Sequence, residues 1–274
     1  MYGEQGKPAA RSAMTVPKLR KMKADGRKIV SITAYDASFA RLVDAAGVDF
    51  VLVGDSLGMV VQGRSSTLPV SVDDMVYHTA AVARGIARAL LIADMPFMSF
   101  RNVDIALASS ARLLADGGAA MVKLEGAGYV LDVIQALARR AIPVCAHLGL
   151  TPQSVHKFGG YRVQGKTRAA AEQLLADAKA VEQAGADLLV LECVPAAVAK
   201  RISAELAIPT IGIGAGVDCD GQVLVIYDML GITPGKRPRF SKDFLGGQGS
   251  VLEAIRAYVK AVRDGEFPAS EHSF

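Results

Sequence analysis

Residues 185–192 read Gly-Ala-Asp-Leu-Leu-Val-Leu-Glu, and this stretch contains the pattern that decides the fold. Its four consecutive apolar residues, Leu188–Leu191, are typical of a parallel strand buried on both faces, because a half-exposed strand alternates apolar and polar residues. Gly185 lies where a helix over Thr167–Ala184 is expected to end, since glycine readily adopts the left-handed conformation of a helix C-cap. An acidic residue, Glu192, follows the strand directly.

The same unit of helix, buried strand and polar strand end recurs along the chain, with no break in composition. The strands that it predicts are Ile29–Ala34, Phe50–Gly54, Leu90–Ala93, Ala120–Leu124, Pro143–Ala146, Asp187–Leu191, Pro209–Ile213 and Gln222–Tyr227. The helices that it predicts are Ala37–Ala46, Val72–Ala89, Val103–Asp116, Tyr129–Arg140, Thr167–Ala184, Ala196–Leu206, a short one near Asp218, and Ser250–Arg263. Eight such units predict an α/β protein with one (β/α)8 TIM barrel.

A doubly wound sheet is the alternative architecture for alternating strands and helices. That fold usually carries a G-x-G-x-x-G fingerprint after its first strand, whereas Ala34-Tyr35-Asp36 stands there. The length of 274 residues also suits one large barrel, which typically has about 250 residues. Ser71 followed by Asp74 resembles a helix capping box, and Gly47 is expected to end a helix as Gly185 does.

The composition excludes several classes of protein. Hydrophobic residues make up 51% of the chain and charged residues 21%, which excludes intrinsic disorder. No apolar run approaches the ~18 residues that a membrane helix requires. Three cysteines without a C-x-x-C pair indicate neither a disulfide framework nor a zinc site, and the basic N-terminus lacks the apolar core of a signal peptide. We therefore expect a soluble, cytoplasmic protein that does not interact with membranes.

Positive charge is concentrated at the N-terminus. Residues 1–28 carry eight Lys and Arg against two acidic residues, a local charge of +6. The formal net charge of the whole chain is +4, so the remaining residues carry −2. We expect residues 1–15 to form a basic arm and residues 16–274 to form the barrel domain. A helix is expected near Pro17–Ala24. An oligomeric binding protein with a nucleic-acid arm is an open alternative, although we expect no nucleic-acid binding because the arm lacks aromatic interleaving and any recognition motif.

Ionisable residues follow several of the predicted strands. They are Asp55, Asp94, Lys123, Glu125, His147 and Glu192. The carboxyl ends of barrel strands meet on one face, which carries the active site in enzymes of this fold. Lys123 and Glu125 are two residues apart and therefore share a face of their strand. The oxygen donors Asp55, Asp94 and Glu125 form a set that suits a hard ion such as Mg2+.

Nine motifs in order resemble the ketopantoate hydroxymethyltransferase family. They are Gly54-Asp55-Ser56-Leu57-Gly58-Met59, Ser66-Thr67-Leu68-Pro69-Val70, Tyr77-His78-Thr79, Ala93-Asp94-Met95-Pro96-Phe97, Val122-Lys123-Leu124-Glu125-Gly126, His147-Leu148-Gly149-Leu150-Thr151-Pro152-Gln153, Gly159-Gly160-Tyr161, Leu191-Glu192-Cys193-Val194-Pro195 and Asp228-Met229-Leu230-Gly231. The resemblance runs from about Lys18 to Phe244, nearly the whole barrel. No single motif is decisive, but their order makes the match specific.

The resemblance implies a barrel of the phosphoenolpyruvate/pyruvate type and an enzyme of pantothenate biosynthesis. Such an enzyme transfers a one-carbon unit from 5,10-methylenetetrahydrofolate to 3-methyl-2-oxobutanoate and gives 2-dehydropantoate. The roles it implies are Mg2+ ligands at Asp55, Asp94 and Glu125, in part through water, substrate contacts at Asp55, Ser56, Asp94 and Lys123, and a proton acceptor at Glu192. It also implies a large homo-oligomer, often a decamer.

Three points stay open from the sequence. A Mg2+-dependent lyase that stabilises a 2-oxo acid enolate is the enzymatic alternative, although the K-K-C-G-like loop typical of such lyases is absent. The segment 151–168 is either a lid over the site or an ordinary surface loop. The glycines of residues 212–216 either cradle a phosphate or let the backbone turn at a crowded rim, and a Pro/Gly/Lys/Arg loop, Gly235–Asp243, follows the last strand.

Overall fold

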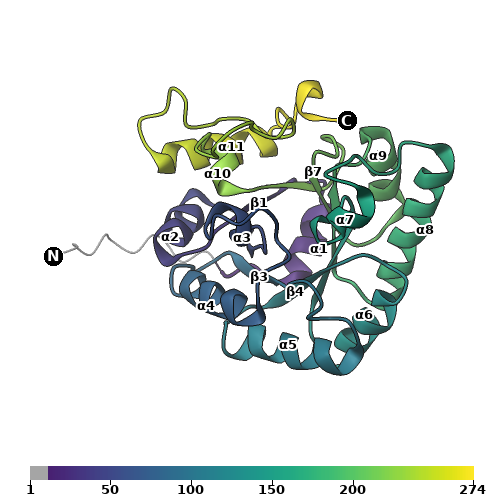
Figure 1. The fold of residues 1–274 in the computed structure, drawn as a ribbon. Coiled ribbons are helices and arrows are strands. Elements are labelled where there is room, and N and C mark those ends of the chain that lie inside the picture. Colours follow the sequence, from purple (N-terminus) through teal and green to yellow (C-terminus); the bar gives the residue numbers. More distant parts are fainter. Residues whose placement is uncertain (1–11) are drawn as a thin grey trace.

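Eight parallel strands close into a barrel in chain order in the computed structural model, which describes residues 12–274 (Figure 1). The strands are β1 (Ile29–Thr33), β2 (Phe50–Val53), β3 (Leu90–Asp94), β4 (Met121–Glu125), β5 (Val144–Gly149), β6 (Leu188–Glu192), β7 (Thr210–Ile213) and β8 (Gly221–Leu224). The pairing of β1 with β8 closes the barrel, with Ile29 opposite Gly221 and Ile32 opposite Leu224. This confirms the predicted fold class.

Helices surround the barrel and connect its strands (Figure 1). They are α1 (Val16–Ala24), α2 (Ala37–Ala46), α3 (Leu57–Val60), α4 (Val72–Ala83), α5 (Val103–Ala115), α6 (Val130–Ala138), α7 (Val155–Phe158), α8 (Arg168–Ala184), α9 (Ala196–Glu205), α10 (Ile226–Met229) and α11 (Val251–Arg263), with 3-10 turns η1 (Pro152–Ser154) and η2 (Ser270–His272). None of the helices found in residues 12–274 combines the length and the hydropathy needed to cross a bilayer.

The helix ends predicted from the sequence are confirmed. Ser71 accepts a hydrogen bond from the Asp74 N–H while Asp74 accepts one from the Ser71 N–H, so α4 begins with a capping box. Gly47 and Gly185 end α2 and α8 with φ of 91° and 108°, in the left-handed region.

One predicted element is wrong and two predicted ends are misplaced, of which one is that of the helix expected over Val72–Ala89, which ends at Ala83. Residues near Asp218 form turns rather than a helix. The last strand ends at Leu224 instead of Tyr227, and α10 begins at Ile226, where the backbone N–H donates to the Thr33 hydroxyl. A run of apolar residues is compatible with either a strand or a short buried helix, so its periodicity could not place this boundary.

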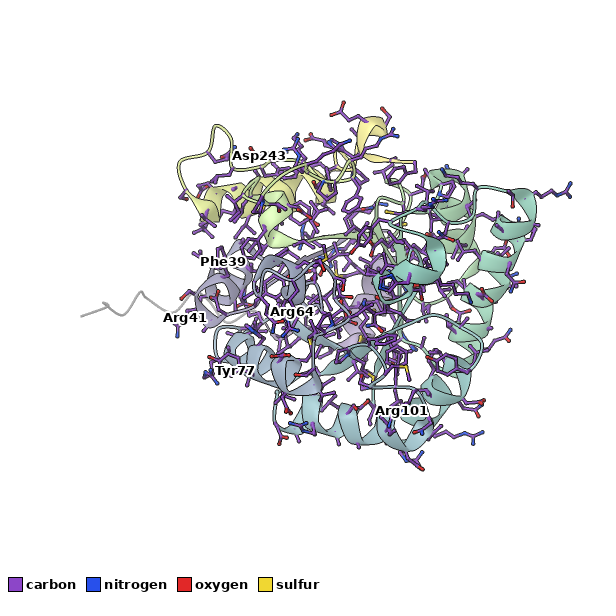
Figure 2. All side chains as sticks on the ribbon, viewed as in Figure 1. Phe39, Arg41, Arg64, Tyr77, Arg101 and Asp243 are labelled. Atoms are coloured by element: carbon purple, nitrogen blue, oxygen red, sulfur yellow. The ribbon has the colours of Figure 1, made fainter. Side chains whose placement is uncertain are left out.

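The outer surface and the core divide as the apolar pattern requires. The strands are almost wholly buried, and every residue of β1 to β4 is buried. Figure 2 shows the labelled Arg41, Tyr77 and Arg101 at the periphery of the molecule, where all three are exposed. The helices therefore cover the barrel and leave its carboxyl-terminal rim as the open face.

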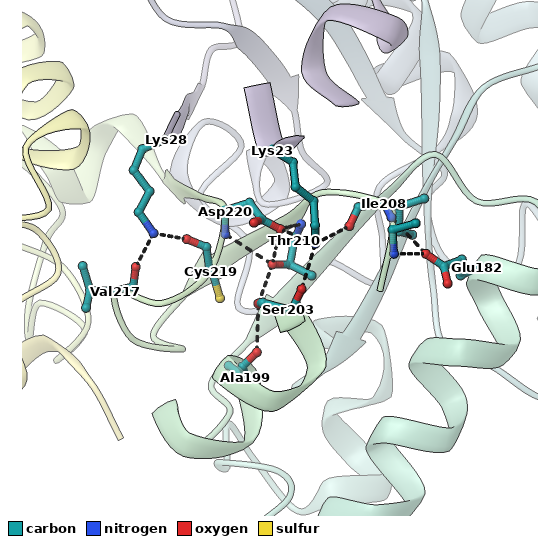
Figure 3. A network of polar contacts seen from close by, with 11 residues as sticks. Lys23, Lys28, Glu182, Ala199, Ser203, Ile208, Thr210, Val217, Cys219 and Asp220 are labelled. Atoms are coloured by element: carbon teal, nitrogen blue, oxygen red, sulfur yellow. Dashed lines mark hydrogen bonds and ion pairs between the residues drawn. The ribbon is translucent and has the colours of Figure 1, made fainter. Parts of the chain in front are cut away.

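Helix α1 closes the opposite end of the barrel, and part of the basic N-terminal sequence holds it there (Figure 3). Lys23 Nζ donates to the carbonyl oxygens of Ser203 and Ile208 at 2.8 and 3.0 Å and pairs with Asp220 at 2.9 Å. Lys28 Nζ donates to the carbonyl oxygens of residues 217 and 219. These lysines therefore anchor the chain instead of forming a free basic surface.

The expected arm of residues 1–15 falls largely outside the described part of the chain, because residues 1–11 are not described. Residues 12–15 already contact the body of the protein: the Met14 N–H donates to the Arg88 carbonyl oxygen at 2.7 Å, and Met14 packs against the core.

Candidate active site

Strand register brings the predicted polar residues together at the carboxyl-terminal rim. Asp94 on β3 lies opposite Lys123 on β4, and Glu125 on β4 lies opposite His147 on β5. Glu192 ends β6, where it is paired with Gly149 of β5. All six predicted site residues line one cavity of about 570 Å3, namely Asp55, Ser56, Asp94, Lys123, Glu125 and Glu192.

Lys123 neutralises part of a cluster of buried carboxylates. Its Nζ lies 2.7 and 2.8 Å from the two carboxylate oxygens of Asp94 and 3.8 Å from Glu125 Oε1, and all three side chains are at most 5% exposed. Burial lowers the pKa of Lys123, but the surrounding carboxylates, Asp94 first, overcome this and raise the pKa above its ordinary value. The lysine is therefore a permanent cation in the barrel.

Within residues 12–274, Lys123 forms ion pairs with Asp94 and Glu125 but not with Asp55. The backbone N–H of Asp55 donates to Asp94 Oδ2 at 3.3 Å, so the Asp94 carboxylate lies against the backbone of residue 55. Burial raises the pKa of Asp55 well above its ordinary value, and repulsion from Asp94 and Glu125 raises it further. Burial also raises the pKa of Asp94, against the opposing effect of Lys123.

Gln153 joins the cluster from segment 151–168, although the sequence analysis assigned it no role beyond a place in a motif. Its Nε2 donates to Asp55 Oδ2 at 2.9 Å and to the Met95 carbonyl oxygen at 3.0 Å, while its backbone N–H donates to Glu125 Oε2 at 3.0 Å. Further along the segment, Tyr161 also lines the cavity. Part of this segment is therefore a wall of the site, and its opening and closing stay a prediction.

His147 lies between two carboxylates on neighbouring strands, and sequence reasoning left it unassigned. Its Nδ1 is 3.4 Å from Glu125 Oε1 and its Nε2 is 3.3 Å from Glu192 Oε2. Burial and Lys123 lower the pKa of His147, but the two glutamates outweigh them and raise it to about 9. Neither ring nitrogen makes a well-aligned hydrogen bond, so the attraction is mainly electrostatic.

Ser56 is oriented by a residue that sequence reasoning missed. Its Oγ is 2.8 Å from the Tyr35 Oη, and Tyr35 is 3% exposed. Burial raises the pKa of Tyr35, so its phenol stays protonated and can donate to Ser56. The signal was present in the sequence, since Tyr35 follows the first strand as the other site residues follow theirs.

The donor set fits a hard divalent cation, although its members are arranged around Lys123 and Gln153. Among residues 12–274, no three His, Cys, Asp or Glu side chains are grouped in a way that could hold a metal ion. The chemistry of the set nevertheless favours one. Three buried carboxylates surround one lysine, and Glu125 Oε1 has no hydrogen-bond partner. A divalent ion would supply the positive charge and the oxygen ligation that these groups lack.

The glycines of residues 212–216 serve close packing. A Cβ on Gly214 would lie 3.0 Å from the Cβ of Phe240 and 3.1 Å from the ring of Phe274, and one on Gly216 would lie 2.6 Å from the Cβ of Ala196. The backbone thus approaches other parts of the chain closely, which accounts for these residues without a phosphate.

Comparison with known proteins agrees with the geometry of this rim. Residues 13–270 match the family model of ketopantoate hydroxymethyltransferase. The chain belongs to this family. It is 60% identical to the 3-methyl-2-oxobutanoate hydroxymethyltransferase of Alkalilimnicola ehrlichii, over 97% of this chain and 96% of that protein. It is 59% identical to the enzyme of the same name from Burkholderia mallei, over 97% and 98% of the two chains.

Solved structures with low identity share the family's fold. Phosphonopyruvate hydrolase in complex with oxalate and Mg2+ aligns with a TM-score of 0.59 at 15% identity, over 94% of this chain and 93% of that one. A 2,3-dimethylmalate lyase of the PEP mutase/isocitrate lyase superfamily aligns with a TM-score of 0.55 at 18% identity, over 81% and 82%. These likenesses confirm the predicted (β/α)8 fold.

Proposed function

We propose that this chain transfers a one-carbon unit from 5,10-methylenetetrahydrofolate to 3-methyl-2-oxobutanoate and gives 2-dehydropantoate, in the biosynthesis of pantothenate. The observation that carries the proposal is that Glu192 lines the same cavity as the cluster of Asp55, Asp94, Lys123 and Glu125, with His147 between it and Glu125. This is what proton abstraction beside a ketone requires: a base on one side and positive charge for the developing enolate on the other. The names of the near full-length relatives support the same reaction.

Each residue then has a distinct task. Lys123 holds the keto-acid carboxylate or the developing oxyanion, and Ser56, oriented by Tyr35, donates a hydrogen bond to the substrate. Asp55, Asp94 and Glu125 would hold Mg2+, directly or through water. When bound, the ion supplies Lewis-acid polarisation of the ketone, which acidifies the neighbouring C3–H. Glu192 accepts the C3 proton, and His147 holds its carboxylate in place.

After the C3 proton has been removed, the enolate carbon attacks the methylene carbon of the folate. A carbon–carbon bond forms, the two bonds from the methylene carbon to the folate nitrogens break, and one water supplies the hydroxyl group. The two freed nitrogens take up the C3 proton that Glu192 had accepted and the remaining proton of the water. The cavity of about 570 Å3 has room for more than a small keto acid, because pockets of about 300–1,000 Å3 hold ligands of drug size.

The deciding experiment is formation of 2-dehydropantoate from the two substrates, with and without EDTA. We expect turnover that EDTA abolishes and Mg2+ restores. A retro-aldol assay with an isocitrate-like substrate tests the lyase alternative. Cleavage there, with no product from the folate and keto acid, would overturn the proposal.

We also propose that the enzyme is cytoplasmic and forms a homo-oligomer, a decamer as the family resemblance implies. Its catalytic domain would span residues 16–274 and follow an arm of residues 1–15. The three cysteines, all buried and unpaired, suit a reducing compartment. Light scattering of the full chain tests the oligomer. Removal of residues 1–11 should leave turnover unchanged, because the contacts of Met14 with the barrel remain.

A further inference from the structure

One arm of the cavity is not used by any of the residues assigned above. It is lined by the segment that follows α10 and by a residue near the end of the chain, and the residues that matter are Lys236, Arg239, Phe240 and Phe274. Both Lys236 and Arg239 are exposed, so this arm opens at the rim of the barrel. Most of these lining residues belong to the basic loop Gly235–Asp243, to which the sequence analysis assigned no role.

The wall of this arm is held in place by contacts within the chain. Arg239 Nε donates to the Glu271 carbonyl oxygen at 3.0 Å, and its guanidinium lies 5.3 Å from the centre of the Phe274 ring. Phe240 and Phe274 pack closely against Gly214, where a Cβ would lie 3.0–3.2 Å from atoms of the two side chains. The result is a fixed surface with aromatic faces and a guanidinium at its edge.

Lys236 differs from these residues because it has no task in the fold. Within residues 12–274 it forms no hydrogen bond or ion pair, and its side chain is exposed at the mouth of the cavity. An exposed lysine that lines a cavity and does not pair with the protein is free to pair with a ligand.

Charge is distributed unevenly along the cavity. Its inner end carries the carboxylates Asp55, Asp94, Glu125 and Glu192 around one lysine, whereas its outer end carries Lys236 and Arg239 against one carboxylate, Asp228, which accepts a hydrogen bond from the Thr233 hydroxyl. An anionic group is therefore repelled from the reaction centre, unless a cation there holds it, and is attracted to the rim. A long ligand with one anionic end would be oriented by this field, with that end outward.

We propose that Lys236 and Arg239 bind the glutamate carboxylates of the one-carbon donor, and that Phe240 and Phe274 contact its aromatic part. This assignment rests on the proposed function, which requires a pteroylglutamate in this cavity, and it adds where the anionic tail lies. The ligand class follows from the chemistry of the arm, because guanidinium and ammonium groups pair with carboxylates and aromatic rings stack on aromatic rings.

The test compares two donors that differ only in the tail: 5,10-methylenetetrahydrofolate and 5,10-methylenetetrahydropteroate, which lacks the glutamate. In the unmodified protein we expect a lower KM for the folate. Lys236→Ala and Arg239→Ala should each raise the KM for the folate about tenfold, since a hydrogen bond to a charged group is lost, and should change the KM for the pteroate and the keto acid much less.

Two cations of the same loop that do not line the cavity provide matched controls. Arg237→Ala is the control for Arg239→Ala, and Lys242→Ala is the control for Lys236→Ala. Both controls should keep the KM for the folate. The KM of the unmodified protein for the folate should also rise with salt, because exposed charges are screened, and this dependence should weaken in Lys236→Ala.

Failure of this inference can be distinguished from failure of the proposed function. If the unmodified protein uses the folate but neither Lys236→Ala nor Arg239→Ala loses its preference for the folate over the pteroate, the tail binds elsewhere and the inference is wrong. If the unmodified protein makes no product from either donor, the proposed function is wrong. Thermal unfolding of each variant checks that Arg239→Ala, which loses its contact with Phe274, still folds.

Discussion

His147 Nε2 lies 3.3 Å from Glu192 Oε2, so a buried imidazole adjoins the carboxylate assigned as the base. The other ring nitrogen lies 3.4 Å from Glu125, and the imidazole therefore links the base to the carboxylate cluster. A protonated ring attracts both glutamates and fixes the direction in which Glu192 presents its free oxygen. The relationship couples the position of the base to the charge of the site.

We expect the stability contributed by His147 to depend on pH. Its pKa is about 9 in the folded protein against 6.5 as the ordinary value, so the contribution is fully present below pH 6.5 and is lost as the pH rises through 9. In metal-free buffer His147→Gln should lower the free energy of unfolding by up to roughly 3 kcal/mol at pH 6, and by much less at pH 10.

Urea unfolding at a series of pH values measures this difference. His156→Gln, at an exposed position of α7, is the control and should leave the pH profile unchanged. A His147→Gln variant whose deficit in stability is the same at pH 6 and pH 10 would show that the ring acts by packing and not by charge.

The barrel and the rim could be predicted because both follow from local patterns. Runs such as Leu188–Leu191 indicate buried parallel strands, and closure of the barrel then places every strand end on one face. Lys123 and Glu125 had to share a face because they are two residues apart, and their contact at 3.8 Å agrees. These inferences need only the period of a strand and the topology of the fold.

The remaining site residues depend on contacts between distant segments. His147 acquires its position from the register of β5 with both β4 and β6, which no single strand encodes. Gln153 reaches Asp55 from a loop 98 residues away along the chain. The sequence pattern gives the residue types of such loops but not the direction of their side chains, so Gln153 and Tyr35 could not be assigned.

We expect loss of Lys123 to destabilise the metal-free protein. Lys123→Met keeps the length of the buried stem but removes the cation that contacts Asp94 and Glu125 and leaves the cluster with the neighbouring His147 alone, and breaking such a buried pair typically costs about 3–5 kcal/mol. The carboxylates then have raised pKa values, so the loss should shrink at acid pH, where they are protonated. Thermal unfolding at pH 7 and pH 4 measures this, and equal losses at the two pH values would contradict it. Weaker keto-acid binding by Lys123→Ala tests the substrate role.

We expect Asp55→Asn to separate stability from metal binding. Burial and the neighbouring Asp94 raise the pKa of Asp55 in the folded state, so at neutral pH its charge opposes folding. The variant should therefore be more stable than the unmodified protein in EDTA. Mg2+ at 100 times its Kd should raise the free energy of unfolding of the unmodified protein by about 2.7 kcal/mol, and its Tm with it. The same concentration should change the Tm of Asp55→Asn little. An equal gain in both proteins would mean that Asp55 does not hold the ion.

The sharpest prediction concerns Glu192, whose position suits a base that does not bind metal. It ends β6, whereas the proposed metal ligands Asp55, Asp94 and Glu125 lie on and after β2 to β4, and its side chain is 14% exposed in the cavity that the substrate would enter. A carboxylate that is separated from the cluster by the His147 ring can reach a substrate carbon in the cavity without ligating the ion. Its backbone is fixed as well, since the Glu192 carbonyl oxygen accepts the Leu150 N–H at 2.8 Å.

Glu192→Gln should therefore still bind Mg2+ and the keto acid but should exchange the C3 proton of the keto acid about 10²–10⁴-fold more slowly in D2O, because the amide cannot accept the proton. NMR of the keto acid alone measures this exchange and needs no folate, so the result does not depend on the second half of the reaction. Glu253→Gln, on the exposed face of α11, is the matched control and should exchange at the unmodified rate. Exchange at that rate in Glu192→Gln would assign the base to another residue.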